Sequence, residues 1–168
     1  MEQLAIFTDG STLNNQTKGD RKGGVGVFFG IDDARNISQP LEETYNNKVT
    51  NQVTELLACI KAIEKIISSE IINNKEVIIY TDSNYTVNII TKWGKNWEKN
   101  NWRKSDGKTV DNIELVKKLY YYSNNLNIKY VHVRSHTKEP KKDDPKYFTW
   151  YGNYMADQLA VNAAKSIN

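Results

Sequence analysis

The sequence predicts a single α/β domain built on a mixed β-sheet with helices packed against it. Three observations predict this class: strand signals fill the first quarter of the chain, helical and strand signals then alternate, and no low-complexity linker divides the chain. A chain of 168 residues can bury roughly 70% of its unfolded surface in one core. We therefore expect one domain over residues 1–168.

The first part of the chain predicts three strands. Apolar runs at 4–8 and 24–29 are typical of strands, and the second run, GVGVFF, begins with closely spaced glycines. A weaker stretch at 36–45 contains Pro40, which cannot donate a hydrogen bond to a neighbouring strand and therefore favours an edge position. Short connections between the three strands suggest an antiparallel meander.

The rest of the chain alternates between helical and strand patterns. Leu56, Ile60 and Ile63 recur at helical spacing, and Thr50 or Asn51 is available as the N-cap of that helix. In chain order we expect a helix at 51–69, a strand at 77–81, helices at 84–93 and 111–122, a strand at 128–133 and a helix at 153–165.

Bulk composition narrows the class of protein. The single cysteine, Cys59, excludes an intramolecular disulfide, and no run of about 18 apolar residues predicts a membrane span. We expect an intracellular protein, in the cytoplasm or nucleus, with no membrane partner. The net charge is only +3, but residues 92–108 carry six basic side chains against two acidic ones, so the basic excess is local.

Acidic residues stand where apolar burial is expected. The stretches IFTDGS at 6–11 and IIYTDS at 78–83 each end a buried strand with an aspartate, Asp9 or Asp82. On a helical wheel Glu55 falls in the apolar arc of the first long helix, where a carboxylate needs an ion pair, a proton or a metal ion. Asp157 lies in the first turn of the predicted last helix, where simple capping is an ordinary explanation.

Convergence of these four acids would point to one kind of chemistry. Hard cations such as Mg²⁺ or Mn²⁺ prefer oxygen ligands, and two ions about 4 Å apart can serve one phosphodiester. The sequence holds neither a cysteine and histidine zinc pattern nor a glycine-rich phosphate loop, because the glycines at 23, 24 and 26 precede a predicted strand rather than a helix.

Five short motifs and one longer segment occur in order along nearly the whole chain. They are TDGS with Asp9, TNQVTELLA with Glu55, YTDS with Asp82, VRSH with His136, GNYMADQLA with Asp157, and the basic segment KWGKNWEKNNWRKSDGKTVDN. This series resembles type 1 ribonuclease H. The resemblance implies a mixed five-stranded sheet in the order 3-2-1-4-5 with helices on both faces, and a hydrolase that cleaves the RNA strand of RNA/DNA hybrids as an endonuclease.

The resemblance also implies roles for single residues in catalysis. Asp9, Glu55, Asp82 and Asp157 match the family's metal ligands and would hold two Mg²⁺ ions, with Mn²⁺ as the alternative. His136 matches a histidine that assists proton movement or product release near the metals, which suits a side chain that titrates close to neutral pH.

Further residues match positions where the family contacts its hybrid substrate. Asn15, Asn51 and Gln52 match hybrid-contacting amides, and amide side chains suit the recognition of 2′-hydroxyls. Thr50 and Asn112 match positions that hold a DNA phosphate, although Thr50 could equally serve as a helix cap.

The basic segment at about 92–112 resembles the family's tryptophan-bearing handle. Trp93 matches an aromatic residue that contacts DNA, and Lys95 and Lys99 would attract phosphates without reading sequence. We assign Trp97 and Trp102 to packing and expect two of the three tryptophans to be buried against each other.

The segment at about 137–151 is predicted to be a loop insertion, because it contains two prolines and mixed charges. Asp143 and Asp144 lie within it and could replace Asp157 as ligands, but a solvated Lys/Asp run accounts for them better. Two other functions stay open: another nuclease of the same fold, such as an exonuclease or a resolvase, and a non-catalytic hybrid-binding module. With any of these functions we expect a monomer.

Overall fold

The computed structural model describes residues 2–13, 21–44, 48–69 and 75–167. Five strands form one sheet in the order β3-β2-β1-β4-β5, as the resemblance implied. In chain order they are β1 (Glu2–Thr12), β2 (Lys22–Phe28), β3 (Ile37–Glu42), β4 (Lys75–Thr81) and β5 (Lys129–His132). The predicted fold class is therefore confirmed.

Strand pairing makes the sheet mixed. β1 is central and pairs antiparallel with β2 but parallel with β4, and β5 then pairs parallel with β4. Pro40 lies on β3, opposite Gly24 of β2, and β3 forms an edge of the sheet as predicted. The glycines at 23, 24 and 26 lie inside β2 rather than before it, because that strand begins at Lys22.

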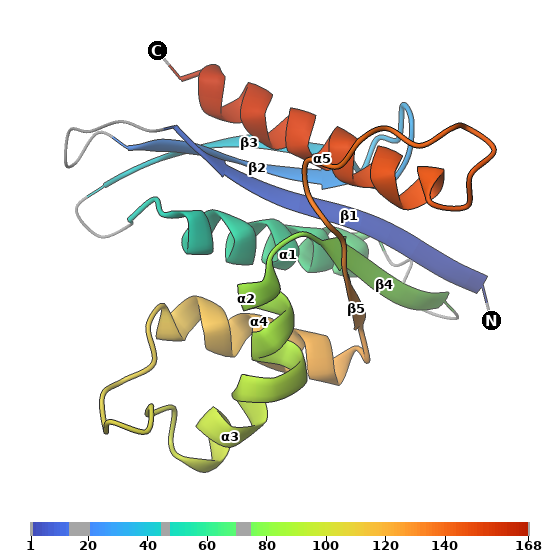
Figure 1. Cartoon of the computed structure of the whole chain (residues 1–168). Coiled ribbons are helices and arrows are strands. Elements are labelled where there is room, and N and C mark those ends of the chain that lie inside the picture. The colour runs from blue at the N-terminus through green and yellow to red at the C-terminus, as the bar shows by residue number, and fades with distance from the viewer. Residues whose placement is uncertain (1, 14–20, 45–47, 70–74, 168) are drawn as a thin grey trace.

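Helices cover both faces of the sheet. They are α1 (Asn51–Ser68), α2 (Asn84–Asn88), the π-helical stretch η1 (Ile89–Trp93), α3 (Gly94–Lys99), α4 (Ile113–Asn125) and α5 (Tyr147–Lys165). Figure 1 shows α1 on one face and α5 on the other, with α4 beyond α1. Thr50 caps α1, since its side chain accepts a hydrogen bond of 3.1 Å from the backbone N–H of Val53.

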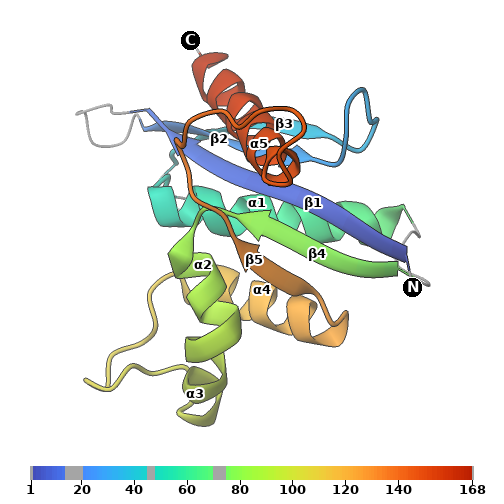
Figure 2. The ribbon, with the colours of Figure 1, turned by 45° about the vertical axis from the view of Figure 1, so that its right-hand side comes forward.

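Apolar side chains fill the space on each side of the sheet. The larger cluster joins the sheet, α1 and α4 around the fully buried Leu56, Ile63 and Ile79. The smaller one lies under α5, where Phe7 and Phe28 meet the helix. The turned view in Figure 2 places the sheet between α1 and α5. None of the described helices is long and apolar enough to cross a membrane.

The last helix begins earlier than the sequence predicts. α5 starts at Tyr147 instead of residue 153, so the segment at 147–151 is helical and only the part before it is a loop. The prediction was wrong because Pro145 ends the loop, and the aromatic residues that follow it recur at helical spacing. Asp157 therefore lies in the third turn of α5, and capping of a first turn does not explain it.

The basic segment is partly helical. The helix predicted to end at Trp93 continues through the π-helical stretch into α3 and ends at Lys99. Farther along, α4 begins at Ile113, directly after Asn112, whose φ of 56° lies in the left-handed region. The segment that resembles the handle thus consists of a helix followed by a loop that returns to α4.

Candidate active site

The register of two parallel strands brings two of the acids together. Thr8 on β1 pairs with Thr81 on β4, so the residues that follow, Asp9 and Asp82, lie next to each other. Asp82 follows the end of β4, whereas β1 continues beside β2 to Thr12, so Asp9 does not end its strand as the sequence predicted. The near-identical stretches TDGS and YTDS are therefore neighbours in space as well as in pattern. Their side chains lie close to each other because the strands run in the same direction.

A close approach of strand and helix adds the third acid. A Cβ on Gly10 would lie 2.4 Å from Oγ1 of Thr54 and 2.7 Å from the backbone nitrogen of Glu55. Only glycine lets β1 run so near the first turn of α1. Glu55 lies on the buried face of that helix, as the helical wheel predicted, and so faces Asp9.

The three carboxylates form a compact group, which we call the acid cluster (Asp9, Glu55 and Asp82). One oxygen from each lies within 4.8 Å of the others. Asp9 is only 4% exposed, and Oε2 of Glu55 is buried without a hydrogen-bond partner among the residues that the structure describes. An unpaired buried carboxylate oxygen is costly, so the site fits a bound cation.

Electrostatics within the acid cluster favour the protonated acids when no cation is bound. Burial raises the pKa of Asp9, and the neighbouring charges of Glu55 and Asp82 raise it further. Burial also raises the pKa of Glu55, with Asp82 adding to the effect. A divalent cation would reverse this preference, because carboxylate oxygens are the ligands that Mg²⁺ and Mn²⁺ prefer.

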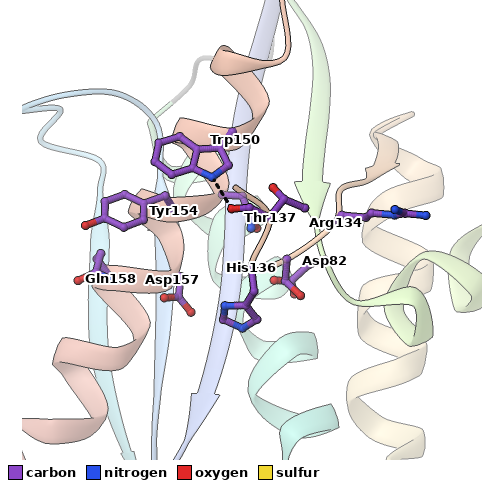
Figure 3. Close-up of a pocket in the computed structure, with 10 residues that line it drawn as sticks. Asp82, Arg134, His136, Thr137, Trp150, Tyr154, Asp157 and Gln158 are labelled. Atoms are coloured by element: carbon purple, nitrogen blue, oxygen red, sulfur yellow. Dashed lines mark hydrogen bonds between the residues drawn. The ribbon is translucent and has the colours of Figure 1, made fainter. Parts of the chain in front are cut away.

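Asp157 and His136 line the same cavity as the acid cluster. This cavity measures about 580 Å³. Figure 3 shows Asp157 on α5 and His136 on the loop after β5, both close to Asp82. Among the described residues, only Asp9, Glu55 and Asp82 have oxygens that all lie within 4.8 Å of one another. Asp157 therefore lies at the margin of the cluster. His136 is exposed and has a φ of 53°.

The structure adds one contact that sequence reasoning missed. Nε2 of His132 lies 3.2 Å from the backbone oxygen of Asp82. Sequence reasoning could not find this contact, because the pairing of β5 with the end of β4 creates it and no local pattern encodes it. Asp143 and Asp144 line neither cavity beside the acid cluster, and Oδ1 of Asp144 accepts a bond from the backbone N–H of Lys146.

The residues expected to contact substrate beside α1 line a second cavity, of about 660 Å³. Thr50, Asn51, Gln52 and Asn112 all lie on its wall. Arg21, which the sequence did not single out, also lies there and adds a positive charge. Asn51 accepts a hydrogen bond from the hydroxyl of Thr12. Asn15 lies outside the described residues.

The tryptophans of the basic segment divide into two groups. Trp93 is 37% exposed, and its ring centroid lies 6.2 Å from Tyr85 and 5.7 Å from Trp97. Trp102 alone of the three is buried, and its ring contacts tyrosines of α4 instead of another tryptophan. The expectation that two tryptophans are buried against each other is wrong, because α4 supplies the packing partners.

The positions of the predicted phosphate-attracting lysines are also clear. Lys95 and Lys99 lie exposed on α3, the helix that also carries Trp97. Asn112 is linked to this region, since its amide nitrogen lies 3.4 Å from the hydroxyl of Tyr85. A row of polar and aromatic groups thus runs from the cavity beside α1 to α3.

The known proteins that this chain resembles include several ribonucleases H. A family model described as RNase H matches residues 1–165. Ribonuclease H of Schizosaccharomyces pombe is 34% identical over 165 residues, which are 97% of this chain and 53% of that protein. Ribonuclease H1 of Rattus norvegicus is 33% identical over 164 residues, which are 98% of this chain and 51% of that protein. The chain thus spans about half the length of these curated relatives.

A solved structure shares the fold. LC11-RNase H1, determined in complex with an RNA/DNA hybrid, is 20% identical and superposes with a TM-score of 0.59. The match covers 96% of both chains. The architecture described above is therefore one that a solved protein adopts over nearly its whole length.

Proposed function

The chain belongs to the ribonuclease H family, and from this premise we propose that it is an endoribonuclease that cleaves the RNA strand of RNA/DNA hybrids. The observation that carries the proposal is the acid cluster, whose three carboxylates present oxygens within 4.8 Å of one another where the parallel pairing of β1 and β4 ends. Such a group serves the hydrolysis of a phosphodiester by divalent ions.

The family and the buried acid cluster together suggest that this chain uses a divalent metal ion. We propose that two Mg²⁺ ions bind, held by Asp9, Glu55 and Asp82 with Asp157 at the margin, and that Mn²⁺ can replace them. When bound, such ions supply Lewis acidity to the phosphodiester and the attacking water and offset the charge of the leaving oxygen.

The side chains around the ions perform the remaining tasks. Asp9 and Glu55 are fixed by the close contact of β1 with α1, so their oxygens are in place before substrate arrives. His136 is exposed on the wall that it shares with Asp82 and Asp157. In that position an imidazole can carry a proton to or from the reacting oxygens.

Substrate selection follows from the row of groups beside the acid cluster. The exposed amides of Asn51 and Gln52 are placed to contact 2′-hydroxyls, which single out RNA. Thr50 and Asn112 share a cavity wall with Arg21, where a DNA phosphate can bind. The determined complex of LC11-RNase H1 with an RNA/DNA hybrid supports the hybrid as substrate.

The handle completes the proposed binding surface. Trp93 is exposed enough to contact a DNA strand, and Lys95 and Lys99 add positive charge on the adjoining helix. These residues lie beyond Tyr85, which connects them to Asn112. We propose that the DNA strand follows this row while the RNA strand passes over the acid cluster.

A cleavage assay on end-labelled hybrids tests the function. With Mg²⁺ we expect the RNA strand to be cut at internal positions and the DNA strand to stay intact, and with a chelator we expect no cut. Single-stranded RNA and double-stranded DNA of the same sequence serve as controls. Hybrid binding without metal-dependent cutting would favour a non-catalytic module, and cutting of the DNA strand would favour another nuclease of this fold.

A further inference from the structure

A row of aromatic rings lies along the first half of α5 and has no part in the function proposed above. The ring centroids of Tyr147 and Trp150 are 5.8 Å apart, and those of Trp150 and Tyr154 are 5.3 Å apart with planes only 11° from parallel. Nε1 of Trp150 donates a 3.1 Å hydrogen bond to the backbone oxygen of Thr137, next to His136. We call these three residues the aromatic ladder; it is held in place by the loop that carries His136.

The ladder ends beside the acid cluster. Tyr154 is 45% exposed, and among the described residues its only ring contact is with Trp150, so one face of the ring has no aromatic neighbour. The next turn of α5 brings Asp157 and Gln158 below it. Figure 3 shows Trp150 and Tyr154 side by side, with Gln158, Asp157 and His136 beyond Tyr154.

A cavity of about 350 Å³ connects the end of the ladder to the site of cleavage. Its wall includes Trp150, Tyr154 and Gln158 as well as Asp82, His136 and Asp157. The open face of Tyr154 therefore borders the same space as groups to which we assigned metal binding and proton transfer. A ligand on that face would lie next to the phosphate being cut.

An unsatisfied polar atom marks the same cavity. Asn153 lines its wall, is only 8% exposed, and its Oδ1 has no hydrogen-bond partner within the described parts of the chain. A buried acceptor without a donor destabilises the protein unless something supplies the donor. The cavity wall thus combines a flat apolar face, the amide of Gln158 and a residue whose buried acceptor lacks a donor.

A nucleobase has the matching features: a flat π-face and polar groups on its edge. Inside a duplex both faces of a base are already stacked, so only an unpaired base can use the face of Tyr154. We propose that this cavity binds one unpaired nucleotide of the strand being cut, with its base stacked on Tyr154 and a donor of the nucleotide bonded to Oδ1 of Asn153. This inference rests on the proposed function, because it takes the acid cluster as the place of cleavage.

The neighbouring surface suits the phosphate that continues such a strand. A cavity of about 610 Å³ shares Trp150 and Thr137 with the first one, and its wall carries His132, Lys138 and Lys146 but no acidic residue. Neither lysine forms a salt bridge with an acidic residue in the segments that the structure describes. An unpaired extension leaving the ladder would therefore meet positive charge.

Binding of blunt and extended hybrids tests the inference. The hybrids are equal in length, and the RNA strand either ends flush or continues by one unpaired nucleotide at its 5′ or its 3′ end. That nucleotide carries a fluorescent adenine analogue that dims when it stacks. Ca²⁺ replaces Mg²⁺, and electrophoresis checks that the strand stays intact. We expect one of the two extensions to bind about five- to a hundredfold tighter than the blunt hybrid and to lose fluorescence on binding.

Variants of Tyr154 identify the residue responsible. Tyr154→Leu should abolish both the tighter binding and the loss of fluorescence, and Tyr154→Phe should keep both, because stacking needs only the ring. Phe148→Leu is the matched control: Phe148 is 57% exposed and also lies on α5, but it lines neither cavity beside the acid cluster. It should leave both signals unchanged.

The results that overturn the inference differ from those that overturn the function. Equal binding of all hybrids, or equal loss of blunt and extended binding in Tyr154→Leu, shows that no unpaired base uses the ring. Neither result bears on the proposed activity, which cleavage of the blunt hybrid in Mg²⁺ tests separately. If Tyr154→Leu does not fold, the unaltered protein still tests the inference. Its binding should dim the adenine analogue in the unpaired extension but not the same analogue in a fully paired position.

Discussion

Asp82 differs from Asp9 in the acid cluster because it is only half-buried, whereas Asp9 is buried. Burial raises the pKa of Asp82, and the neighbouring Asp157 adds to this effect. A hydrogen bond with Asp9 and the nearby imidazoles of His136 and His132 lower the pKa. Its carboxylate faces the cavity that it shares with Asp157, whereas Asp9 lies deeper between β1 and α1. The charge of Asp82 can therefore be removed with less disturbance of packing than the charge of Asp9.

Asp82→Asn should abolish metal-dependent cleavage while leaving the fold intact. Loss of one ligand should lower the cleavage rate by at least about a hundredfold, since even residues that only support a ligand cost 10- to 100-fold when changed. Without metal the variant should be as stable as the unaltered protein or slightly more so, because one repulsive charge is gone. Cleavage rate and thermal unfolding measure the two effects.

Asp143→Asn is the control for that experiment. Asp143 is exposed and lines neither cavity at the acid cluster, so cleavage should persist. If Asp82→Asn unfolds instead, Asp82 is held in a structural ion pair and the assignment as a metal ligand is wrong.

Contact between whole elements depends on positions that lack a side chain. Gly26 on β2 faces α5, and a Cβ there would lie 2.2 Å from the backbone oxygen of Ala156 and 2.7 Å from the backbone nitrogen of Ala160. Both atoms belong to the helix backbone and cannot turn away. The sheet and α5 can therefore pack this closely only with glycine at 26, and this packing positions Asp157.

Gly26→Ala should destabilise the protein by about 2 kcal/mol or more, the cost of an overpacked contact that moves the backbone. Gly30→Ala is the matched control, since the nearest atoms to its added Cβ are 3.8 Å away, an ordinary contact. Urea or thermal unfolding of both variants gives the comparison. Equal stabilities would show that α5 is not seated against β2 as described.

The handle acts as an element through charge. Lys95 and Lys99 are exposed on α3 and should contribute to hybrid binding through phosphates only. Lys95→Gln with Lys99→Gln should weaken binding to all hybrid sequences alike. It should also reduce the slope of log affinity against log salt by up to roughly two, about one per lost contact. Lys165→Gln, an exposed change at the far end of α5, should leave the slope unaltered.

Collecting several acids in one place makes the stability of the whole molecule depend on pH. In the folded protein Asp9 and Glu55 have pKa values above their ordinary 3.8 and 4.5. The folded state therefore holds protons that the unfolded chain has released once the pH exceeds these ordinary values. Since the folded state then binds more protons, raising the pH favours unfolding.

We expect the metal-free protein to lose stability as the pH rises from about 5 to about 8, with a fall in Tm of about 4 °C or more. Excess Mg²⁺ should reduce this fall, because the ion binds the deprotonated acids of the folded state only. Glu55→Gln should flatten the profile, and the exposed Glu114→Gln should not. Thermal unfolding in chelator across this pH range checks the prediction, and a profile that rises with pH contradicts it.

Local patterns determined the elements of this protein. Apolar runs predicted four of the five strands, and the weaker stretch at 36–45 with its Pro40 predicted the edge strand. Helical spacing predicted α1 and the buried position of Glu55. Each of these features depends on neighbours in the sequence. The resemblance to a family supplied the strand order, which periodicity cannot encode. Helix ends were less certain, as the early start of α5 shows, since ring packing across elements extends a helix beyond its polar pattern.

Only the tertiary structure decided which side chains meet. The distance between Asp9 and Asp82 depends on parallel pairing of β1 with β4, and the approach of Glu55 depends on the missing side chain at Gly10. The contact of His132 with Asp82, the partners of Trp102 and the end of the aromatic ladder at the cavity likewise join residues from different elements. Sequence spacing fixes direction within an element, whereas separation between elements follows from how their surfaces pack.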